Sequence, residues 1–207
     1  ISIFENTTSD GIINSSSFAP KVDISTGTTP QILILDDLDD DNKLDIAVTN
    51  KASNTISIYK NNGATGAVST NNFAAKVDFV TASQPYSITS GDINGDGKVD
   101  IAVTNTNGRV VSLYKNKGVQ GEINSNLFEP KVDFPTSADS YCVSISDLDQ
   151  DTKPEVIFTN YNNTGTQNIS ILKFNNFEVL GTLNQFNACV GSPSAAQTLT
   201  IQGSNLT

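Results

Sequence analysis

The chain has 207 residues, 37% of them hydrophobic, and a formal net charge of −10. This length allows one sizeable core, or one domain and part of a second. The acidic balance excludes a basic surface for nucleic acid, and no apolar run approaches the roughly 18 residues of a membrane helix, so we expect neither nucleic-acid binding nor membrane insertion.

The negative charge is concentrated in three short segments, 36–45, 92–100 and 147–155. Together they hold 13 of the 22 acidic residues and 3 of the 12 basic ones, a net −10, whereas the rest of the chain has 9 of each and is neutral. Like charges packed this closely repel one another unless a cation lies among them. The three segments are therefore candidate cation sites.

In chain order, residues 1–24 match the second half of a β unit, and three full units follow. In the first unit, the apolar runs 31–35 and 44–50 predict strands buried on both faces. The alternating run 55–60 predicts a half-buried strand, and the more polar run 73–79 predicts a fourth strand. Each unit thus contains four predicted strands that become more polar along the chain, and no predicted helix.

The unit repeats with a period of 55 residues. Two markers keep this spacing, the starts of the acidic loops and a phenylalanine-led motif: Asp37, Asp92 and Asp147; Phe18, Phe73 and Phe128. A fixed period of this size indicates a repeat architecture, and four strands of increasing polarity fit a β-propeller blade. We therefore predict an all-β fold of four-stranded antiparallel blades.

The predicted domain organisation is a partial propeller over residues 1–183. It comprises a half blade at 1–24 and blades at 31–79, 86–134 and 141–183, and residues 184–207 are interpreted as a linker and the start of a further β domain. About three and a half blades fall short of the 4–8 in a typical closed ring. Either the other blades lie outside this chain, or the chain forms an open arc, or two copies combine.

The acidic loops carry oxygen-bearing side chains at alternate positions. Positions 1, 3 and 5 are acidic or amide residues, position 7 is a lysine whose carbonyl can coordinate while its charged end faces water, and position 9 is an acid where the next strand begins. The predicted metal ligands are Asp37, Asp39, Asp41, Lys43, Asp45, Asp92, Asn94, Asp96, Lys98, Asp100, Asp147, Asp149, Asp151, Lys153 and Glu155. Oxygen ligands without His or Cys suit a hard cation, and a flexible shell of about six to eight ligands favours Ca²⁺ over Mg²⁺. We expect two to three structural calcium sites; the alternative is metal-free acidic turns.

The loops differ from an EF-hand, which needs a bidentate Glu at position 12 and flanking helices. Position 12 here is Val48, Val103 or Phe158, inside an apolar strand. The succession of a DxDxDGxxD-type loop, "DIAVTN", "NTISIYKNNG" and "FAAKVDF" resembles the FG-GAP/VCBS repeats of bacterial secreted proteins, relatives of the integrin α-subunit propeller, over about residues 1–183. The resemblance implies a β-propeller with Ca²⁺ in the hairpin between the first two strands of a blade, often in adhesion or ligand display.

The three loops are not expected to be equal. Position 6 needs a left-handed backbone, which Gly97 adopts freely and Asn42 tolerates, whereas the β-branched Thr152 costs about 1–2 kcal/mol there. Pro154 also pushes Lys153 toward an extended conformation. We therefore predict that loop 147–155 is the weakest or most distorted.

Several other residues recur with the repeat. Phe18, Phe73, Phe128, Tyr59 and Tyr114 favour packing between blades over a sugar-binding platform. The Thr-Asn pairs at 49–50, 104–105 and 159–160 are interpreted as turns at strand ends.

The two cysteines, Cys142 and Cys189, lie 47 residues apart without a CxxC spacing. They are interpreted as unpaired thiols, with Cys142 buried in a strand; a disulfide between them is the alternative.

The leading functional hypothesis is a non-enzymatic, calcium-binding propeller segment of a secreted or cell-surface protein that binds a protein or glycan ligand. The chain has no histidine, so Ser-His-Asp and Cys-His arrangements are absent. The alternatives are a propeller module of a polysaccharide-active enzyme whose catalytic residues lie elsewhere, and a structural spacer. Self-association to complete the propeller is a further expectation.

Overall fold

The computed structural model describes residues 1–8, 11–63, 68–161, 168–173 and 178–184. In this part of the chain nearly all regular structure is β-strand, and one short 3-10 helix, η1 (Thr70–Asn72), accompanies it. The predicted all-β fold is confirmed. The described residues contain no helix with the length and apolar character of a membrane span.

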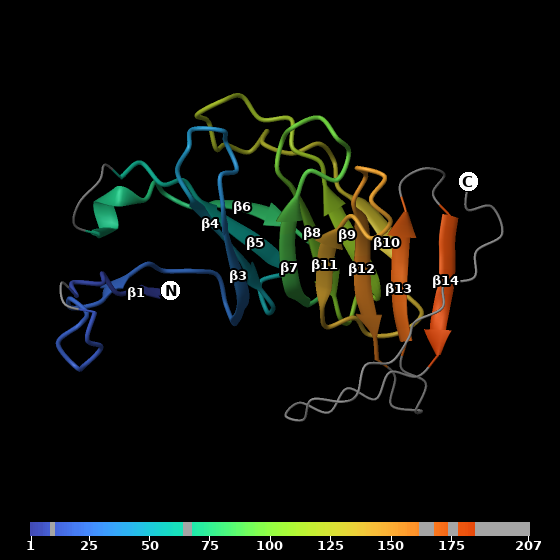
Figure 1. The fold of residues 1–207 in the computed structure, drawn as a ribbon, viewed down its shortest axis with the longest axis horizontal. Helices are drawn as coiled ribbons and strands as arrows, with labels where there is room; N and C mark the ends of the chain where they lie inside the picture. Colours follow the sequence, from blue (N-terminus) through green and yellow to red (C-terminus); the bar gives the residue numbers. More distant parts are fainter. Residues whose placement is uncertain (9–10, 64–67, 162–167, 174–177, 185–207) are drawn as a thin grey trace.

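The strands form one two-stranded sheet and three four-stranded antiparallel sheets, which we call the half blade and blades 1 to 3 (Figure 1). The half blade consists of β1 (Ser2–Ile3) and β2 (Val22–Asp23). Blade 1 consists of β3 (Pro30–Asp36), β4 (Asp45–Asn50), β5 (Thr55–Tyr59) and β6 (Val77–Val80). Blade 2 consists of β7 (Pro85–Gly91), β8 (Asp100–Asn105), β9 (Val110–Tyr114) and β10 (Val132–Pro135). Blade 3 consists of β11 (Val143–Ser146), β12 (Glu155–Asn160), β13 (Asn168–Lys173) and β14 (Glu178–Asn184).

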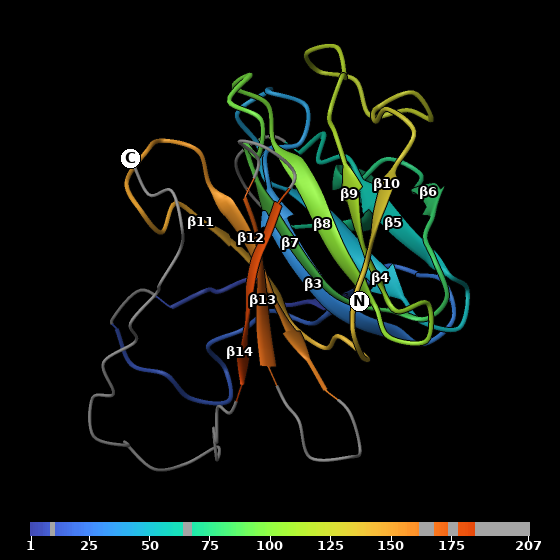
Figure 2. The same cartoon turned by 90° about the vertical axis from the view of Figure 1, so that its right-hand side faces the viewer.

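Within each blade the four strands lie in chain order, so each pairs with the strand that follows it. The first strands of the three blades, β3, β7 and β11, lie side by side, and the blades follow one another along the molecule (Figures 1 and 2). This arrangement places the loop after each first strand at a corresponding position in every blade.

The core lies between the sheets rather than inside one of them. Between blades 1 and 2, Ile56 and Ile58 of β5 share a cluster with Ile101 and Val103 of β8. A second cluster joins blades 2 and 3, and a third joins the half blade to blade 1. Because β4 and β8 are central strands covered on both faces, all their residues are buried, which explains why each reads as a continuous apolar run.

The predicted burial of both faces of residues 31–35 is wrong. Ile32, Leu33 and Leu35 of β3 are exposed, and Leu33 keeps 45% of its surface accessible. Ile88, at the same repeat position in β7, is only 4% exposed because β3 lies beside it. The half blade supplies counterparts of a third and a fourth strand, so the described chain places no first strand against this side of β3.

The fourth strand is shorter than the run 73–79 predicted. It begins at Val77, and Phe73 instead makes an isolated bridge with Asn61. Asn116 and Phe128 form the corresponding bridge in blade 2. These bridges close the long connection between the third and fourth strands.

The recurring aromatic residues pack between blades, as predicted, at four of the five positions. The Tyr59 hydroxyl donates to the Ser25 carbonyl oxygen at 2.6 Å, and the Tyr114 hydroxyl donates to the Val80 carbonyl oxygen at 2.9 Å. Phe128 meets Phe79 of blade 1 edge to face, with ring centroids 5.0 Å apart. These contacts tie blade 1 to the half blade and blade 2 to blade 1. Phe18 is exposed and Phe73 packs beside the half-blade cluster.

Two further expectations need correction. Cys142 is exposed and precedes β11, because the strand begins only at Val143; Cys189 lies outside the described residues. The Thr-Asn pairs are the last residues of β4, β8 and β12 rather than turns.

Replacing Tyr114 with phenylalanine tests the inter-blade hydrogen bond. Tyr114→Phe keeps the ring and leaves the Val80 carbonyl oxygen without its donor, so we expect a loss of about 1 kcal/mol and a fall of about 2–4 °C in the midpoint of thermal unfolding. Tyr86→Phe is the matched control, because no hydrogen bond of the Tyr86 hydroxyl is found among the described residues. Equal midpoints for the two variants would contradict the assignment.

Candidate metal centres

An acidic loop joins the first strand of each blade to the second. Loop 1 (37–45) connects β3 to β4, loop 2 (92–100) connects β7 to β8, and loop 3 (147–155) connects β11 to β12. Position 9 of each loop is the first residue of the second strand. The loops are therefore fixed at one end to buried strands.

The first aspartate of each loop organises the turn. The two carboxylate oxygens of Asp37 accept hydrogen bonds from the backbone N–H groups of Asp41 at 3.0 Å and Asn42 at 2.7 Å. Asp92 and Asp147 accept the same pair of bonds from positions 5 and 6 of their own loops. The three loops thus share one backbone conformation.

The position 7 lysines contribute their backbone to the same frame. The Lys43 N–H donates to the Asp41 carboxylate at 3.0 Å, and the other two loops repeat this bond. The Lys43 ammonium also donates to Asp41, at 3.1 Å, and the Lys98 ammonium donates to the Gly118 carbonyl oxygen at 2.6 Å. These two charged ends contact protein and also remain accessible to water, since the Lys43 side chain is 40% exposed and Lys98 is exposed. Coordination by the position 7 carbonyls stays a prediction.

The position 9 carboxylates are buried anchors. Asp45 accepts from the N–H of Leu38 at 3.1 Å and from the N–H of Asn61 at 2.8 Å, and Asp100 makes the same two bonds in blade 2. Burial raises the pKa of Asp45 to about 6, and it also raises the pKa of Asp100, although the backbone donors oppose the rise. Both oxygens of each side chain are already engaged, so in this structure the two residues tie the loop to the end of the third strand.

The structure brings the predicted ligands together in loops 1 and 3. In each loop, three carboxylates place one oxygen apiece within 4.8 Å of one another: Asp37, Asp39 and Asp41; Asp147, Asp149 and Glu155. In loop 2, position 3 is an amide, and Asn94 accepts from the N–H of Asp96 at 2.9 Å and donates to its carboxylate at 3.1 Å. Loop 2 therefore carries fewer charges within the same frame.

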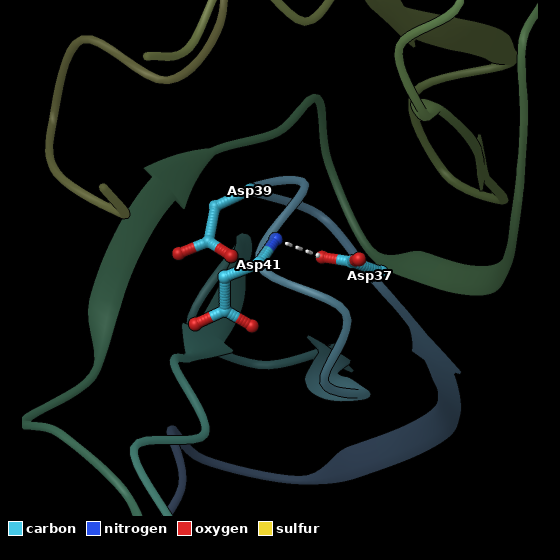
Figure 3. A group of neighbouring side chains, drawn as sticks. All are labelled: Asp37, Asp39 and Asp41. Atoms are coloured by element: carbon cyan, nitrogen blue, oxygen red, sulfur yellow. Dashed lines mark hydrogen bonds between the residues drawn. The ribbon is translucent and has the colours of Figure 1, made fainter. Parts of the chain in front are cut away.

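One buried oxygen in loop 1 has no hydrogen-bond partner. The Asp39 side chain is 0% exposed, and its Oδ1 atom makes no hydrogen bond in the structure. Figure 3 shows the carboxylate of Asp39 next to that of Asp41, on the inner side of the loop. A buried, unpaired carboxylate oxygen among other carboxylates fits the oxygen-rich coordination shell of a hard cation such as Ca²⁺.

A contact that the sequence did not predict holds loop 1 against blade 2. The Asn116 side chain donates to the Leu38 carbonyl oxygen at 2.9 Å, the Gln120 side chain donates to that of Asp40 at 2.8 Å, and the Gly121 N–H donates to that of Asp39 at 2.7 Å. These bonds join residues about eighty positions apart, so no local sequence pattern predicts them. We call residues 116–121 the clasp.

Position 6 is left-handed in all three loops, as predicted. The φ angles are +64° at Asn42, +83° at Gly97 and +70° at Thr152. Thr152 is the one β-branched side chain of the three, and its N–H is held by Asp147 at 2.9 Å, so the frame imposes the strained angle.

Relieving this strain should stabilise blade 3. For Thr152→Gly we expect an increase of about 1 kcal/mol in the free energy of unfolding in EGTA, because glycine adopts positive φ without a Cβ clash. Asn42→Gly at the same position of loop 1 is the control and should change stability by less, since asparagine tolerates this angle. Chemical denaturation of both variants measures the difference, and a destabilised Thr152→Gly would show that the side chain has a supporting role.

Comparison with known proteins identifies the repeat. The family model described as an FG-GAP-like repeat matches residues 37–103 and 92–158, and both matches begin at position 1 of an acidic loop. No curated protein matches the chain. The two matches together cover more than half of the sequence, in the part that contains all three acidic loops, blade 1 without its first strand, and the whole of blade 2. The chain therefore belongs to the FG-GAP-like repeat family.

Proposed function

We propose that this chain is a calcium-stabilised β-propeller segment of a secreted or cell-surface protein, and that it serves as a non-catalytic scaffold for adhesion or ligand binding. The proposal assigns a structural role to the acidic loops and leaves ligand recognition to the exposed faces of the blades. Loops on such faces vary freely over a common frame, which suits display of a binding surface.

The observation that carries the calcium assignment is the frame shared by the three loops. The same backbone bonds recur at positions 1, 5, 7 and 9, and they bring carboxylates close together in loops 1 and 3. Asp39 adds a buried oxygen without a hydrogen-bond partner. A divalent cation would offset the repulsion among these carboxylates and satisfy that oxygen.

Thermal unfolding in calcium tests the assignment. With dissociation constants of about 10⁻⁴ M, Ca²⁺ at about 1 mM adds about 1.4 kcal/mol per occupied site. Two or three sites should then raise the unfolding midpoint by about 5–15 °C relative to EGTA. Magnesium at the same concentration should produce a much smaller rise, and equal midpoints in calcium and EGTA would refute the proposal.

A charge-neutral variant assigns the effect to loop 1. Asp39→Asn keeps the shape of the side chain and removes one of the three neighbouring carboxylates, so we expect one calcium fewer per chain by isothermal titration calorimetry. Glu122→Gln removes one charge from an exposed residue outside the loops and is the control. An unchanged stoichiometry for Asp39→Asn would exclude a site in loop 1.

A glycan or a protein is the proposed ligand class. Binding assays against glycan and extracellular-matrix protein arrays, combined with a turnover assay on polysaccharides, separate the scaffold from the enzyme module. Binding without turnover supports the scaffold, turnover supports the module, and the absence of any ligand favours a spacer.

We also propose that a second copy of the chain covers β3 and extends the propeller. The support is the comparison along the repeat: Leu33 is 45% exposed where Ile88 and Val143, its counterparts in blades 2 and 3, are 4% and 6% exposed. An apolar position that is buried in blades 2 and 3 and exposed in blade 1 indicates that blade 1 lacks a neighbour on this side.

Self-association should therefore depend on β3. Light scattering during size-exclusion chromatography at increasing concentration should detect a dimer, and Leu33→Lys should shift it to monomer because a charge at the contact costs free energy when desolvated. Val119→Lys alters an exposed apolar residue of the clasp and is the control. If the chain stays monomeric at all concentrations, a second copy does not cover β3, and blades outside this chain would have to cover it.

A further inference from the structure

A lysine at one repeat position reaches into the acidic loop of its own blade. Lys60 follows β5, Lys115 follows β9 and Lys173 ends β13, so all three stand at the end of a third strand. The Lys60 ammonium donates to Asp39 and, at 2.7 Å, to Asp41. The Lys173 ammonium donates to Asp149 and lies 3.1 Å from a carboxylate oxygen of Asp151.

The Lys60 pair differs from an ordinary surface pair because it lies in the loop interior, whereas the carboxylates that pair with Lys173 are 38% and 31% exposed. The Lys60 side chain is 15% exposed and its partner Asp39 is 0% exposed. A carboxylate removed from water to this degree needs a cation close by. The lysine contacts positions 3 and 5, which are also predicted metal ligands, while Asp39 Oδ1 remains without a hydrogen bond. The ammonium therefore satisfies only part of the site.

The contact follows the charge of each loop. In loop 2, where position 3 is Asn94, the Lys115 ammonium stays 3.8 Å from Asp96 and 3.9 Å from Glu129, and its side chain is 49% exposed. The lysine thus contacts the two loops that have a carboxylate at each of positions 1, 3, 5 and 9, and it stays at the rim of loop 2, which has three.

We propose that Lys60 and Lys173 are built-in counter-ions that neutralise loops 1 and 3 without calcium and are displaced when calcium binds. The proposal rests on the calcium sites proposed above and adds their regulation. An ammonium and a divalent ion compete for the same carboxylates and repel each other, so the lysine weakens calcium binding while preserving the loop in its absence. Loop 2, whose lysine makes only a longer contact with Asp96 at 3.8 Å, binds calcium with less of this competition.

Removing the lysines tests the proposal. In Lys60→Met/Lys173→Met, the repulsion between a unit charge and a divalent ion about 5 Å apart is lost, so calorimetry should show calcium dissociation constants roughly tenfold lower at two sites. The unfolding midpoint in EGTA should fall, and the rise produced by calcium should grow.

The matched control is Lys76→Met/Lys131→Met, which removes the same charge. These lysines pair with Asp78 and Asp133 in the fourth strands, outside the loops. Lys115→Met provides a second comparison and should change calcium affinity by less than either engaged lysine.

Each outcome decides the proposal. If wild type binds calcium and the double variant binds it no more tightly than the control variant does, the counter-ion role is wrong and the calcium sites stand. If the double variant binds calcium more weakly than wild type, the lysines support the metal, and the counter-ion role is again wrong. If only the variant binds calcium, the lysines block the sites in the native chain. The proposed function then fails, and the counter-ion role stands without displacement by calcium. If neither protein binds calcium, both proposals fail.

Discussion

Repulsion among carboxylates held in loops that lead into buried second strands is the constraint on which the rest of the molecule depends. The acidic loops cannot relieve it by spreading, because Asp45 and Asp100 begin fully buried strands and use both oxygens to hold backbone N–H groups. The first aspartate of each loop fixes the remaining backbone in the same way. The negative charge therefore stays concentrated, and a cation must accompany it, whether a lysine ammonium or a metal ion.

The loops also connect parts of the molecule that sheet hydrogen bonds do not join. Asp45 binds the residue that follows its blade's third strand by two positions, and the clasp binds loop 1 to blade 2. In repeat proteins, stability is approximately a sum of unit and nearest-neighbour terms. Loop 1 contributes to both terms. The net charge of loop 1 therefore affects both the stability of blade 1 and the contact between blade 1 and blade 2.

The repeat and its strands were predictable because they rest on local patterns that recur with the period, and the left-handed position 6 was predictable from the residues that tolerate it. The exposure of β3 was not, since an apolar run reads the same whether or not a neighbouring sheet covers it. The roles of Lys60 and Asn116 were also missed. Their partners lie 21 and 78 residues away, and a long polar side chain at the end of a strand gives no sequence pattern that would predict its partner.

The two tyrosine hydrogen bonds run in one direction along the chain. Tyr59 and Tyr114 each donate to a carbonyl oxygen 34 residues earlier, at the end of the preceding sheet. During synthesis the N-terminal units emerge first. The tyrosines of blades 1 and 2 therefore find their acceptors already synthesised when the third strand of each blade leaves the ribosome, so these two blades can be added one at a time to the sheet before them.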